Sequence, residues 1–427
     1  GDVYKRQFLD DLDHLITLHH RKYMKYADLS VFDWEQRKLV DLVDRVTRKN
    51  QDLVSELPLT ISAQYGLIDQ NEFFDKRVAS KDVSGYYLIE NGEFAYNKST
   101  STDAPWGAIK RLDRYKNGVL STLYIVFGIK ENNPVDSDFL VSYYSTNLWH
   151  KGIHEIAAEG ARNHGLLNIA PADFFETKLM IPQDIEEQKK IGKYFEELER
   201  LITLHQRKCE ETKTLKKYML QKMFPQNGHS VPEIRFSGFT EDWEQRKLGE
   251  LGSLKNGMNF SKEAMGIGFP FVNLQNIFGN NVIDVTNLGK AMASDSQLKD
   301  YNLLNGDVLF VRSSVKLEGV GEAALVPQNL ENTTYSGFII RFRDEYGLDN
   351  NFKRFLFGIE SVRNQIMAQA TNSANKNISQ TVLENLCLKI PNKSEQEKIG
   401  LYFSNLDHLI TLHHRKQNYV LNTLIYA

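Results

Sequence analysis

The chain has little cysteine, and it contains no long hydrophobic run. Only two of its 427 residues are cysteines, Cys209 and Cys387, and neither stands at the short spacing of a metal site, so neither a disulfide framework nor a zinc site is expected. The longest apolar runs, such as LYIVF at 123–127, fall far short of the roughly 20 residues that a membrane-spanning helix needs. No basic start followed by an apolar stretch and a small-residue cleavage site is visible. These absences together predict a cytoplasmic protein without a membrane partner.

An excess of charge of one sign is also missing. Lysine and arginine number 52 and aspartate and glutamate 55, which gives a net charge of −3. This balance excludes a protein that holds nucleic acid non-specifically through a basic tail. It leaves room for sequence-specific binding, because a few cations on one surface suffice for that. A length of 427 residues predicts two to three domains.

What the sequence does have is a long internal repeat. WEQRKL occurs at 34–39 and again at 243–248, 209 residues later (243 − 34). EQKKIGKYFEELERLITLHQRK at 187–208 is matched by EQEKIGLYFSNLDHLITLHHRK at 395–416, 208 residues later (395 − 187). A duplicated module predicts two equivalent tasks on one partner, and duplex nucleic acid is the partner whose form repeats along an axis.

The two ends of the chain depart from this pattern. Residues 8–22 form a partial third copy of the repeated segment, and residues 1–7 (GDVYKRQ) match neither other copy, so we interpret them as a scar or a fragment end. Only 11 residues separate Lys22 from Trp34, whereas 34 separate Lys208 from Trp243. The last copy stops at Ala427, before any match to LKKYMLQKMFP of 215–225.

The repeated segment has the heptad spacing of a long helix with one seam. The seam positions are Ile191, Phe195, Leu198, Ile202, His205, Cys209 and Thr212 in the central copy, and Ile399, Phe403, Leu406, Ile410, His413, Gln417 and Val420 in the last copy. The first four of each series are the predicted coiled-coil and subunit interface. The central helix is expected from about Ile185 to Phe224, roughly 60 Å long. The two helices are expected to pack antiparallel as a spacer; the alternative is that each packs on its own domain.

The stretches between the helices predict two globular domains of one fold. NGEFAYNKST at 91–100 matches NGDVLFVRSS at 305–314, and STLYIVF at 121–127 matches SGFIIRF at 336–342. Asn-Gly predicts a tight turn with an alternating strand after it. The fold class is therefore α+β, with two similar recognition domains separated by long helices that form an antiparallel coiled coil. The expected boundaries are 1–29 for the partial helix copy, 30–183 for domain 1, 184–226 for the central helix, 227–391 for domain 2 and 392–427 for the last helix.

The best candidates for DNA contacts lie at matching places in the two domains. Lys98 and Arg312 align just after the Asn-Gly turn, where cations could bind phosphates. Other candidates are the neighbouring hydroxyl and basic residues Ser99, Ser313, Arg111, Arg114 and Lys316, and the loop residues Arg162, Asn163, Asn372, Asn375 and Lys376. The alternative is that these are ordinary surface cations and polar connecting loops.

Catalytic motifs are weak throughout. Gly319-Val320-Gly321 is a lone GxG, and Asn133-Pro134 lacks the second proline and the aromatic of an adenine methylase motif. Glu187-Gln188-Lys189 lies on the charged face of the repeated helix, and no Walker loop is present. Adjacent histidines on a helix, such as His413-His414, point about 100° apart and cannot converge on one metal ion.

The order of these motifs resembles the specificity subunit of type I restriction-modification enzymes. The resemblance rests on WEQRKL, on PEIRFSGFTED at 232–242 and on the two copies of EQxKIGxYFxxLxxLITLHxRK, and it covers residues 8–427. It implies that each globular domain reads one half of a split duplex DNA target and that the helices fix the gap. It implies no catalysis in this chain and no cofactor of its own. The implied partners are two modification subunits, which methylate adenine with S-adenosylmethionine, and restriction subunits, which use ATP and Mg²⁺.

Three alternatives stay open at this point. A stand-alone enzyme with two catalytic domains would need one acid, base or nucleophile set in both copies, whereas the shared residues are mostly apolar, Gly or Ser. A coiled-coil adaptor that binds only protein would lack the steep salt dependence of phosphate contacts. A recombinant, non-functional specificity subunit would fold without assembling.

Overall fold

The structure is a computed structural model. It describes residues 34–62, 65–76, 78–101, 104–131, 135–157, 167–226, 228–371 and 375–426. The chain divides into two compact units, Gly1–Arg200 (unit 1) and Leu201–Ala427 (unit 2). The partial helix copy predicted at 8–22 lies outside the described residues.

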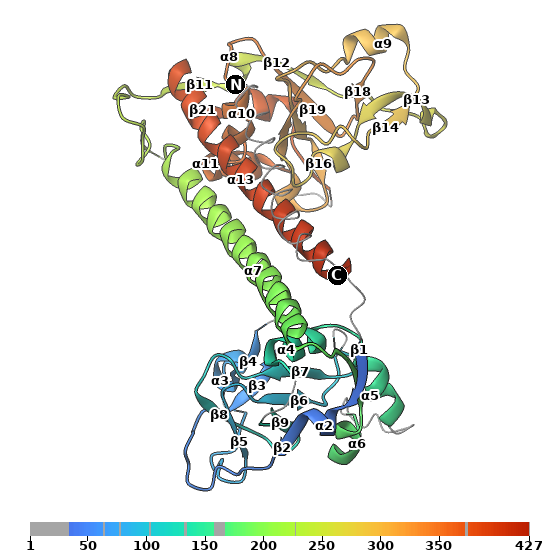
Figure 1. The fold of residues 1–427 in the computed structure, drawn as a ribbon. Coiled ribbons are helices and arrows are strands. Elements are labelled where there is room, and N and C mark those ends of the chain that lie inside the picture. Colours follow the sequence, from blue (N-terminus) through green and yellow to red (C-terminus); the bar gives the residue numbers. More distant parts are fainter. Residues whose placement is uncertain are drawn as a thin grey trace. The chain divides into compact units, whose positions relative to one another are not determined.

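Unit 1 is built around a four-stranded antiparallel sheet (Figure 1). Its strands, in spatial order, are β2 (Val43–Val46), β9 (Ile125–Ile129), β6 (Phe94–Asn97) and β7 (Ala108–Arg111). Two further strand pairs are β3 (Leu59–Ser62) with β4 (Gly66–Asp69) and β5 (Tyr87–Glu90) with β8 (Asn117–Leu120). The helices before the long one are α3 (Gln70–Phe74), α4 (Ser137–Ser145), α5 (His150–Ile156) and α6 (Pro171–Phe175).

Unit 2 repeats this plan with a second sheet of its own. The four-stranded sheet has the order β12 (Gly252–Asn256), β19 (Ile339–Asp344), β15 (Val308–Val311) and β17 (Ala323–Leu325). The others are β14 (Gly289–Ala291), β13 (Met265–Val272) and β18 (Thr334–Tyr335) in one sheet, and β16 (Ser313–Ser314) with β20 (Lys376–Asn377). The shorter helices are α9 (Asp295–Asp300), α10 (Asn350–Leu356), α11 (Glu360–Gln369) and α12 (Gln380–Glu384), with 3₁₀ turns η1 (Lys262–Ala264), η2 (Leu274–Asn276) and η3 (Leu317–Gly319).

The strand after each Asn-Gly turn is central and is buried on both faces. Val308 and Phe310 of β15 belong to a core that helices cover, whereas Leu309 and Val311 belong to a separate core beside the second sheet. β6 divides its residues between two cores in the same way. The expected alternation of apolar and polar residues was therefore wrong, because a strand between two covering layers needs apolar side chains in both directions. The tight turn itself is present, with Gly92 at φ 86° and Gly306 at φ 90°.

The repeated WEQRKL motif closes each unit. It forms β1 (Trp34–Lys38), which pairs antiparallel with β10 (Lys178–Pro182), and β11 (Glu244–Lys247), which pairs with β21 (Cys387–Ile390). The leucines that follow lie in the short helices α2 (Leu39–Leu42) and α8 (Leu248–Leu251) and are fully buried. The first strand of each unit thus holds the strand that leads into the long helix.

The two long helices are α7 (Ile185–Lys222) and α13 (Lys393–Tyr426), close to the expected bounds. Within unit 2 they run antiparallel: His205 faces His413, with 3.2 Å between the two Nδ1 atoms, Cys209 Sγ lies 3.9 Å from the Ile410 carbonyl, and Lys216 pairs with Asp407 at 2.5 Å. Neither these helices nor any other in the described ranges is long and apolar enough to cross a membrane.

The first half of the predicted seam has a different role. Ile399, Phe403 and Leu406 lie in the main core of unit 2, and Ile191 packs against the core of unit 1. Part of each seam therefore packs on the adjoining unit, as the alternative of separate packing expected. Ile202 and Ile410 are half-buried further along, near the His205–His413 contact. The antiparallel pairing and the separate packing are both present, on successive stretches of the same helices.

Candidate nucleic-acid interface

The matched cations Lys98 and Arg312 lie at the ends of the central strands. In unit 1 the Leu167 amide donates to the Lys98 carbonyl at 3.0 Å, and in unit 2 the Ile378 amide donates to the Arg312 carbonyl at 3.0 Å. Next to Arg312, Ser313 pairs with Asn377 in the β16–β20 ladder. In both units the strand end thus meets the chain that follows the predicted loop. Leu167 and Ile378, about 70 residues after the two cations in sequence, thus lie beside them.

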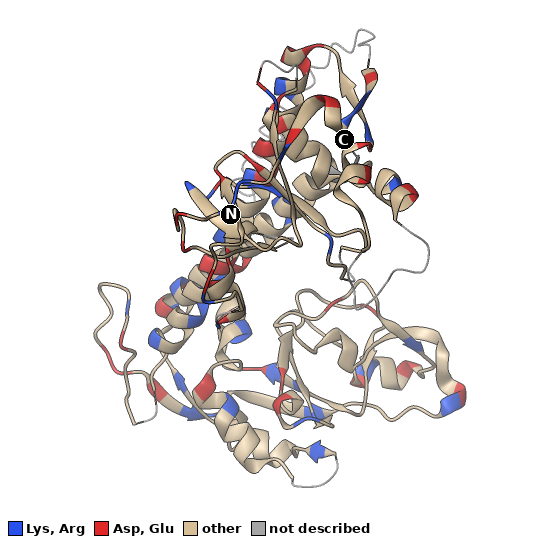
Figure 2. Ribbon diagram, turned by 90° about the horizontal axis from the view of Figure 1, so that it is seen from below, with Lys and Arg blue, Asp and Glu red and all other residues tan. Residues whose placement is uncertain are grey.

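Each of these two cations contacts a main-chain oxygen. Lys98 Nζ donates to the Ile169 carbonyl at 3.3 Å, and Arg312 Nη1 donates to the Gly337 carbonyl at 3.4 Å. Burial lowers the pKa of Lys98. A neutral carbonyl orients a cation without neutralising it, so these contacts keep both charges available to an anion such as phosphate. Basic and acidic positions are interspersed over both units (Figure 2), so such local placement matters more than net charge.

An exposed apolar residue lies on the same turn in both units. The Tyr124 amide donates to the Ser121 carbonyl at 3.1 Å, and the Ile339 amide donates to the Ser336 carbonyl at 2.9 Å. Inside these turns, Leu123 and Phe338 donate their amides to the hydroxyls of the same serines, at 3.4 and 3.3 Å. Their side chains are nevertheless 57% and 58% exposed.

This turn lies beside the matched cation. In unit 2 the Arg312 amide donates to the Phe338 carbonyl at 2.8 Å. In unit 1 the antiparallel pairing of Tyr96 with Ile125, continued by two residues, places Leu123 opposite Lys98. Leu123 and Phe338 lie in the two matched segments, but neither was among the predicted DNA contacts. A repeated three-residue pattern could have identified them. In both copies a serine is followed two residues later by a large apolar residue, directly before a buried strand.

Unit 2 also has a hollow at this place, with a volume of about 510 Å³. Its lining includes Phe278, Ser313, Ser314, Val315, Lys316, Glu318, Glu322, Phe338 and Asn375. Val315 is 77% exposed, and Lys316 and Asn375 are exposed as well. Amide, hydroxyl, carboxylate and apolar groups are those that read the edges of bases, so the lining has the chemistry of a recognition surface.

Arg111 does not fit the predicted phosphate contact. Its guanidinium donates to Asp113 at 2.6 Å and to Asp138 and Ser137 at 2.7 Å. Although burial lowers the pKa of Arg111, the hydrogen bonds and charges of the two aspartates raise it overall. Two carboxylates already neutralise this side chain, so we assign it to the packing of α4 against β7.

The remaining predicted residues are spread over several places. Arg114 is exposed in the segment after β7, and the pairing of Phe94 with Arg111 and of Asn97 with Ala108 places that segment at the opposite end of β6 from Lys98. Ser99 is exposed next to Lys98, and Lys376 is partly buried in β20. Arg162, Asn163 and Asn372 lie outside the described residues.

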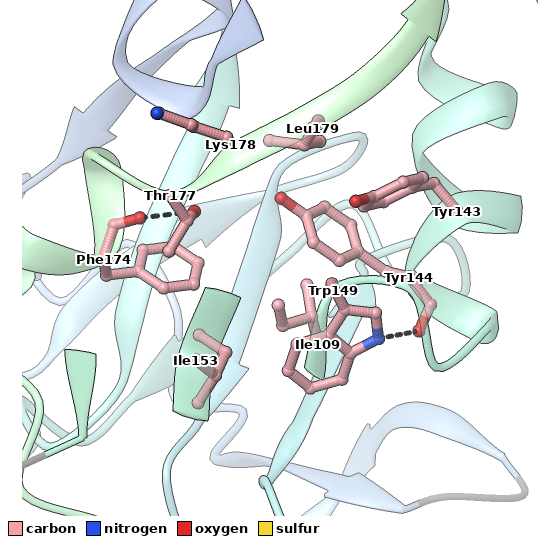
Figure 3. A pocket seen from close by; sticks show the side chains of 9 residues that line it. All are labelled: Ile109, Tyr143, Tyr144, Trp149, Ile153, Phe174, Thr177, Lys178 and Leu179. Carbon is pink, nitrogen blue, oxygen red and sulfur yellow. Dashed lines mark hydrogen bonds between the residues drawn. The ribbon is translucent and has the colours of Figure 1, made fainter. Parts of the chain in front are cut away.

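The aromatic cavity of unit 1 is too small for a substrate (Figure 3). Its volume is about 10 Å³, and Tyr143, Tyr144, Trp149 and Phe174 are among its walls. The buried Tyr144 hydroxyl has no hydrogen-bond partner among the described residues, and burial raises its pKa. A space of this size accommodates at most about one water molecule. Within the described ranges, no three His, Cys, Asp or Glu side chains are grouped as metal ligands.

Comparison with known proteins agrees with this architecture. The family model for the type I restriction modification DNA specificity domain matches residues 33–214 and again 240–422. The chain therefore belongs to the type I restriction-modification DNA specificity family. The two matched stretches correspond to the two repeated modules, each a globular part with its long helix.

Individual relatives are distant. The type I restriction enzyme EcoKI specificity subunit of Escherichia coli K12 is 25% identical over 284 residues, which is 64% of this chain and 58% of that protein. The putative type I restriction enzyme MjaX specificity subunit of Methanocaldococcus jannaschii is 22% identical, over 91% of this chain and 90% of its own. The crystal structure of the type I restriction-modification S subunit from M. genitalium has a TM-score of 0.55 at 12% identity, covering 93% of this chain and 96% of that one. That likeness supports the fold.

Proposed function

We propose that each unit of this DNA-specificity protein reads one half of a split duplex target and that the two long helices fix the gap between the halves. The observation that carries the proposal is the repeated surface at the end of the central strand. Lys98 with Leu123, and Arg312 with Phe338, occupy equivalent places in two units whose other surface residues differ. Two domains that recognise different DNA sequences need a common backbone arrangement with different surface side chains.

The proposed division of work follows the chemistry of the groups. Lys98 and Arg312 bind phosphate oxygens and set the register of each unit on the duplex. Hydroxyl and amide groups at Ser99, Ser313 and Asn375 donate to or accept from base edges in the major groove. Leu123 and Phe338 supply apolar contact with a thymine methyl group, the one apolar feature of the base edges.

The proposed partners supply all of the catalysis. Two modification subunits methylate adenine with S-adenosylmethionine, and restriction subunits use ATP and Mg²⁺, so this chain needs no cofactor of its own. The names of the relatives, each called a specificity subunit, support this assignment. The weak catalytic motifs of the sequence support it further.

Co-expression with the cognate modification subunits, followed by sequencing of methylated adenine, tests the proposal. The expected result is methylation at one motif with two defined halves and a constant gap. Arg312→Ala should weaken methylation of that motif and reduce the dependence of log binding on log salt by about one unit. Lys299→Ala is the control in the same unit, because Lys299 is an exposed cation on α9, in the segment that precedes β15, whereas Arg312 follows β15.

Two outcomes would contradict the proposal. A stable complex that methylates no split motif would show that the chain assembles without reading DNA. If the chain bound neither the modification subunits nor DNA, and only other proteins were recovered with it, it would be a protein-binding adaptor.

A further inference from the structure

Each long helix carries a glutamine and a glycine at the same spacing near its start. Gln188 and Gly192 on α7 match Gln396 and Gly400 on α13, both pairs 208 residues apart (396 − 188 and 400 − 192). In each unit the pair faces the N-terminus of one short helix, α4 in unit 1 and α10 in unit 2. We call these two places joint 1 and joint 2.

The glutamine of each joint makes the same two hydrogen bonds. In joint 1 the Gln188 Oε1 accepts from the Asp136 amide at 2.8 Å, and its Nε2 donates to the Pro182 carbonyl at 2.8 Å. In joint 2 the Gln396 Oε1 accepts from the Asp349 amide at 3.0 Å, and its Nε2 donates to the Pro391 carbonyl at 2.9 Å. Both glutamines are buried, at 0% and 2% exposure, so these bonds satisfy groups that water does not reach.

The aspartates at the joints are the N-caps of the short helices. Asp136 accepts from the Phe139 amide at 2.9 Å, and Asp349 accepts from the Phe352 amide at 2.8 Å. The main chain of each cap is therefore bound to the long helix, while its side chain is bound to the short helix. One residue ties the two helices together in each unit.

The glycine of each joint allows the backbones to meet. A Cβ on Gly192 would lie 2.7 Å from the Asp138 carbonyl carbon and the Phe139 nitrogen. A Cβ on Gly400 would lie 2.6 Å from the Phe352 nitrogen. The nearest obstructing atoms are backbone atoms, which cannot move aside as a flexible side chain can. Glycine is unfavourable in the interior of a helix, so a close approach of this kind explains its presence in both copies.

We propose that Gln188 with Gly192, and Gln396 with Gly400, are positioning residues that fix the angle between each recognition unit and its long helix. They thereby set the gap between the two halves of the DNA target. This inference rests on the proposed function. A side chain at either glycine forces the short helix away from the long one, and the unit turns about the joint. Successive base pairs rise by about 3.4 Å, so a small rotation at the joint changes the register of that unit along the duplex.

The test uses the full chain and duplexes in which both half-sites are kept and the gap is varied one base pair at a time. Gly192→Ala and Gly400→Ala are each expected to retain both half-site sequences. Each should shift the preferred gap or reduce the preference for the wild-type gap over its neighbours by about tenfold. Lys193→Ala and Leu401→Ala are the matched controls, because each alters the exposed residue directly after the glycine. Both controls should keep the wild-type gap.

The results distinguish a failure of the proposed function from a failure of the proposed role of the joints. If wild-type protein selects no split target at all, the proposed function fails whatever the joints do. If wild type selects one gap and both glycine variants keep it with unchanged preference, the inference is overturned, even when the variants melt at lower temperature. The two variants alter different units, so one that does not fold leaves the other to decide the question.

Discussion

Among the described residues, the side chains next to joint 2 are more deeply buried than those next to joint 1. Glu395, directly before Gln396, is fully buried and receives two hydrogen bonds from Arg235, at 2.7 and 2.8 Å. Its counterpart Glu187 is half-buried and accepts one bond, from Trp34 Nε1 at 3.3 Å. Burial raises the pKa of Glu187, since a single indole donor only partly compensates the desolvation of its carboxylate.

The difference comes from the segment after α7. Met223, Phe224, Ile234 and Phe236 all pack in the core of unit 2, and Phe224 lies 6.1 Å from the Phe403 ring. Phe403 is fully buried as a result, while the matching Phe195 is only half-buried. The same helix motif is therefore packed to different degrees in the two units.

The largest expected effect is that of Phe403→Ala. Removal of a fully buried ring should lower the free energy of unfolding of unit 2 by about 3–5 kcal/mol. Phe195→Ala should lower that of unit 1 by less than about half as much, because less of its ring is removed from water. Hydrogen exchange measured peptide by peptide in denaturant assigns each loss to its unit. Equal losses at the two positions would contradict the comparison.

The next largest effect is expected from Arg235→Ala, which should lower the free energy of unfolding of unit 2 by about 3 kcal/mol, because it leaves the Glu395 carboxylate buried and unpaired. The double variant Arg235→Ala/Glu395→Gln should recover part of the loss, since the charge is then removed. In unit 1, Trp34→Phe deletes the corresponding hydrogen bond and should change stability by no more than about 1 kcal/mol. Denaturant titration of the three variants tests this order, and a loss at Arg235 no larger than at Trp34 would refute it.

A smaller effect is expected from the exposed turns. Phe338→Ala and Leu123→Ala should each reduce discrimination at one base pair, by about 1 kcal/mol, in different halves of the target. Stability should change by no more than about 0.5 kcal/mol, because both side chains are largely exposed. Leu148→Ala is the control, since Leu148 is 62% exposed elsewhere in unit 1. Binding to a set of singly substituted targets measures the effect, and loss in the same half for both variants would contradict separate readers.

The smallest effect is a pH dependence at the contact of His205 with His413. Burial is the main cause that lowers the pKa of both imidazoles, and the charge of Lys416 is the second. His413 also lowers the pKa of His205, and Lys208 also lowers the pKa of His413. The folded state therefore binds these protons less readily than the unfolded state, whose pKa is near 6.5. Stability of unit 2 should be constant above pH 6.5 and fall as the pH drops below it toward the lower folded pKa values.

Replacement of one imidazole tests this assignment. His413→Gln should flatten the pH dependence of melting between pH 7.5 and 5.5, whereas His414→Gln, the exposed neighbour, should leave it unchanged. An unchanged slope in the His413 variant would place the titrating groups elsewhere.

The elements defined by local periodicity were predictable from the sequence. The heptad spacing predicted a helix from Ile185 to Phe224, and the structure has Ile185–Lys222. The antiparallel direction followed from the duplication. The pairing of WEQRKL with the strand before each long helix was not predictable, because the partners are about 140 residues apart and no local pattern encodes a distant register.

The candidate site was predicted only in outline. The matched repeats located Lys98 and Arg312, yet they could not show that Leu167 and Ile378 lie beside them, nor that Asp113 and Asp138 already hold Arg111. The half-buried state of Phe195 against the full burial of Phe403 depends on tertiary packing alone, since the two helix copies read almost the same. Gly192 and Gly400 were visible as an unfavourable residue within a helix, but only the contact with α4 and α10 explains them.

Selection from random duplex DNA by the full chain with its modification subunits tests the central claim most directly. The account predicts enrichment of one bipartite motif with two defined halves and a single gap, and Phe338→Ala should weaken selection of bases in the half read by unit 2 without changing the other half. Enrichment of one contiguous motif, or equal weakening of both halves by that substitution, would contradict the assignment of one half to each unit.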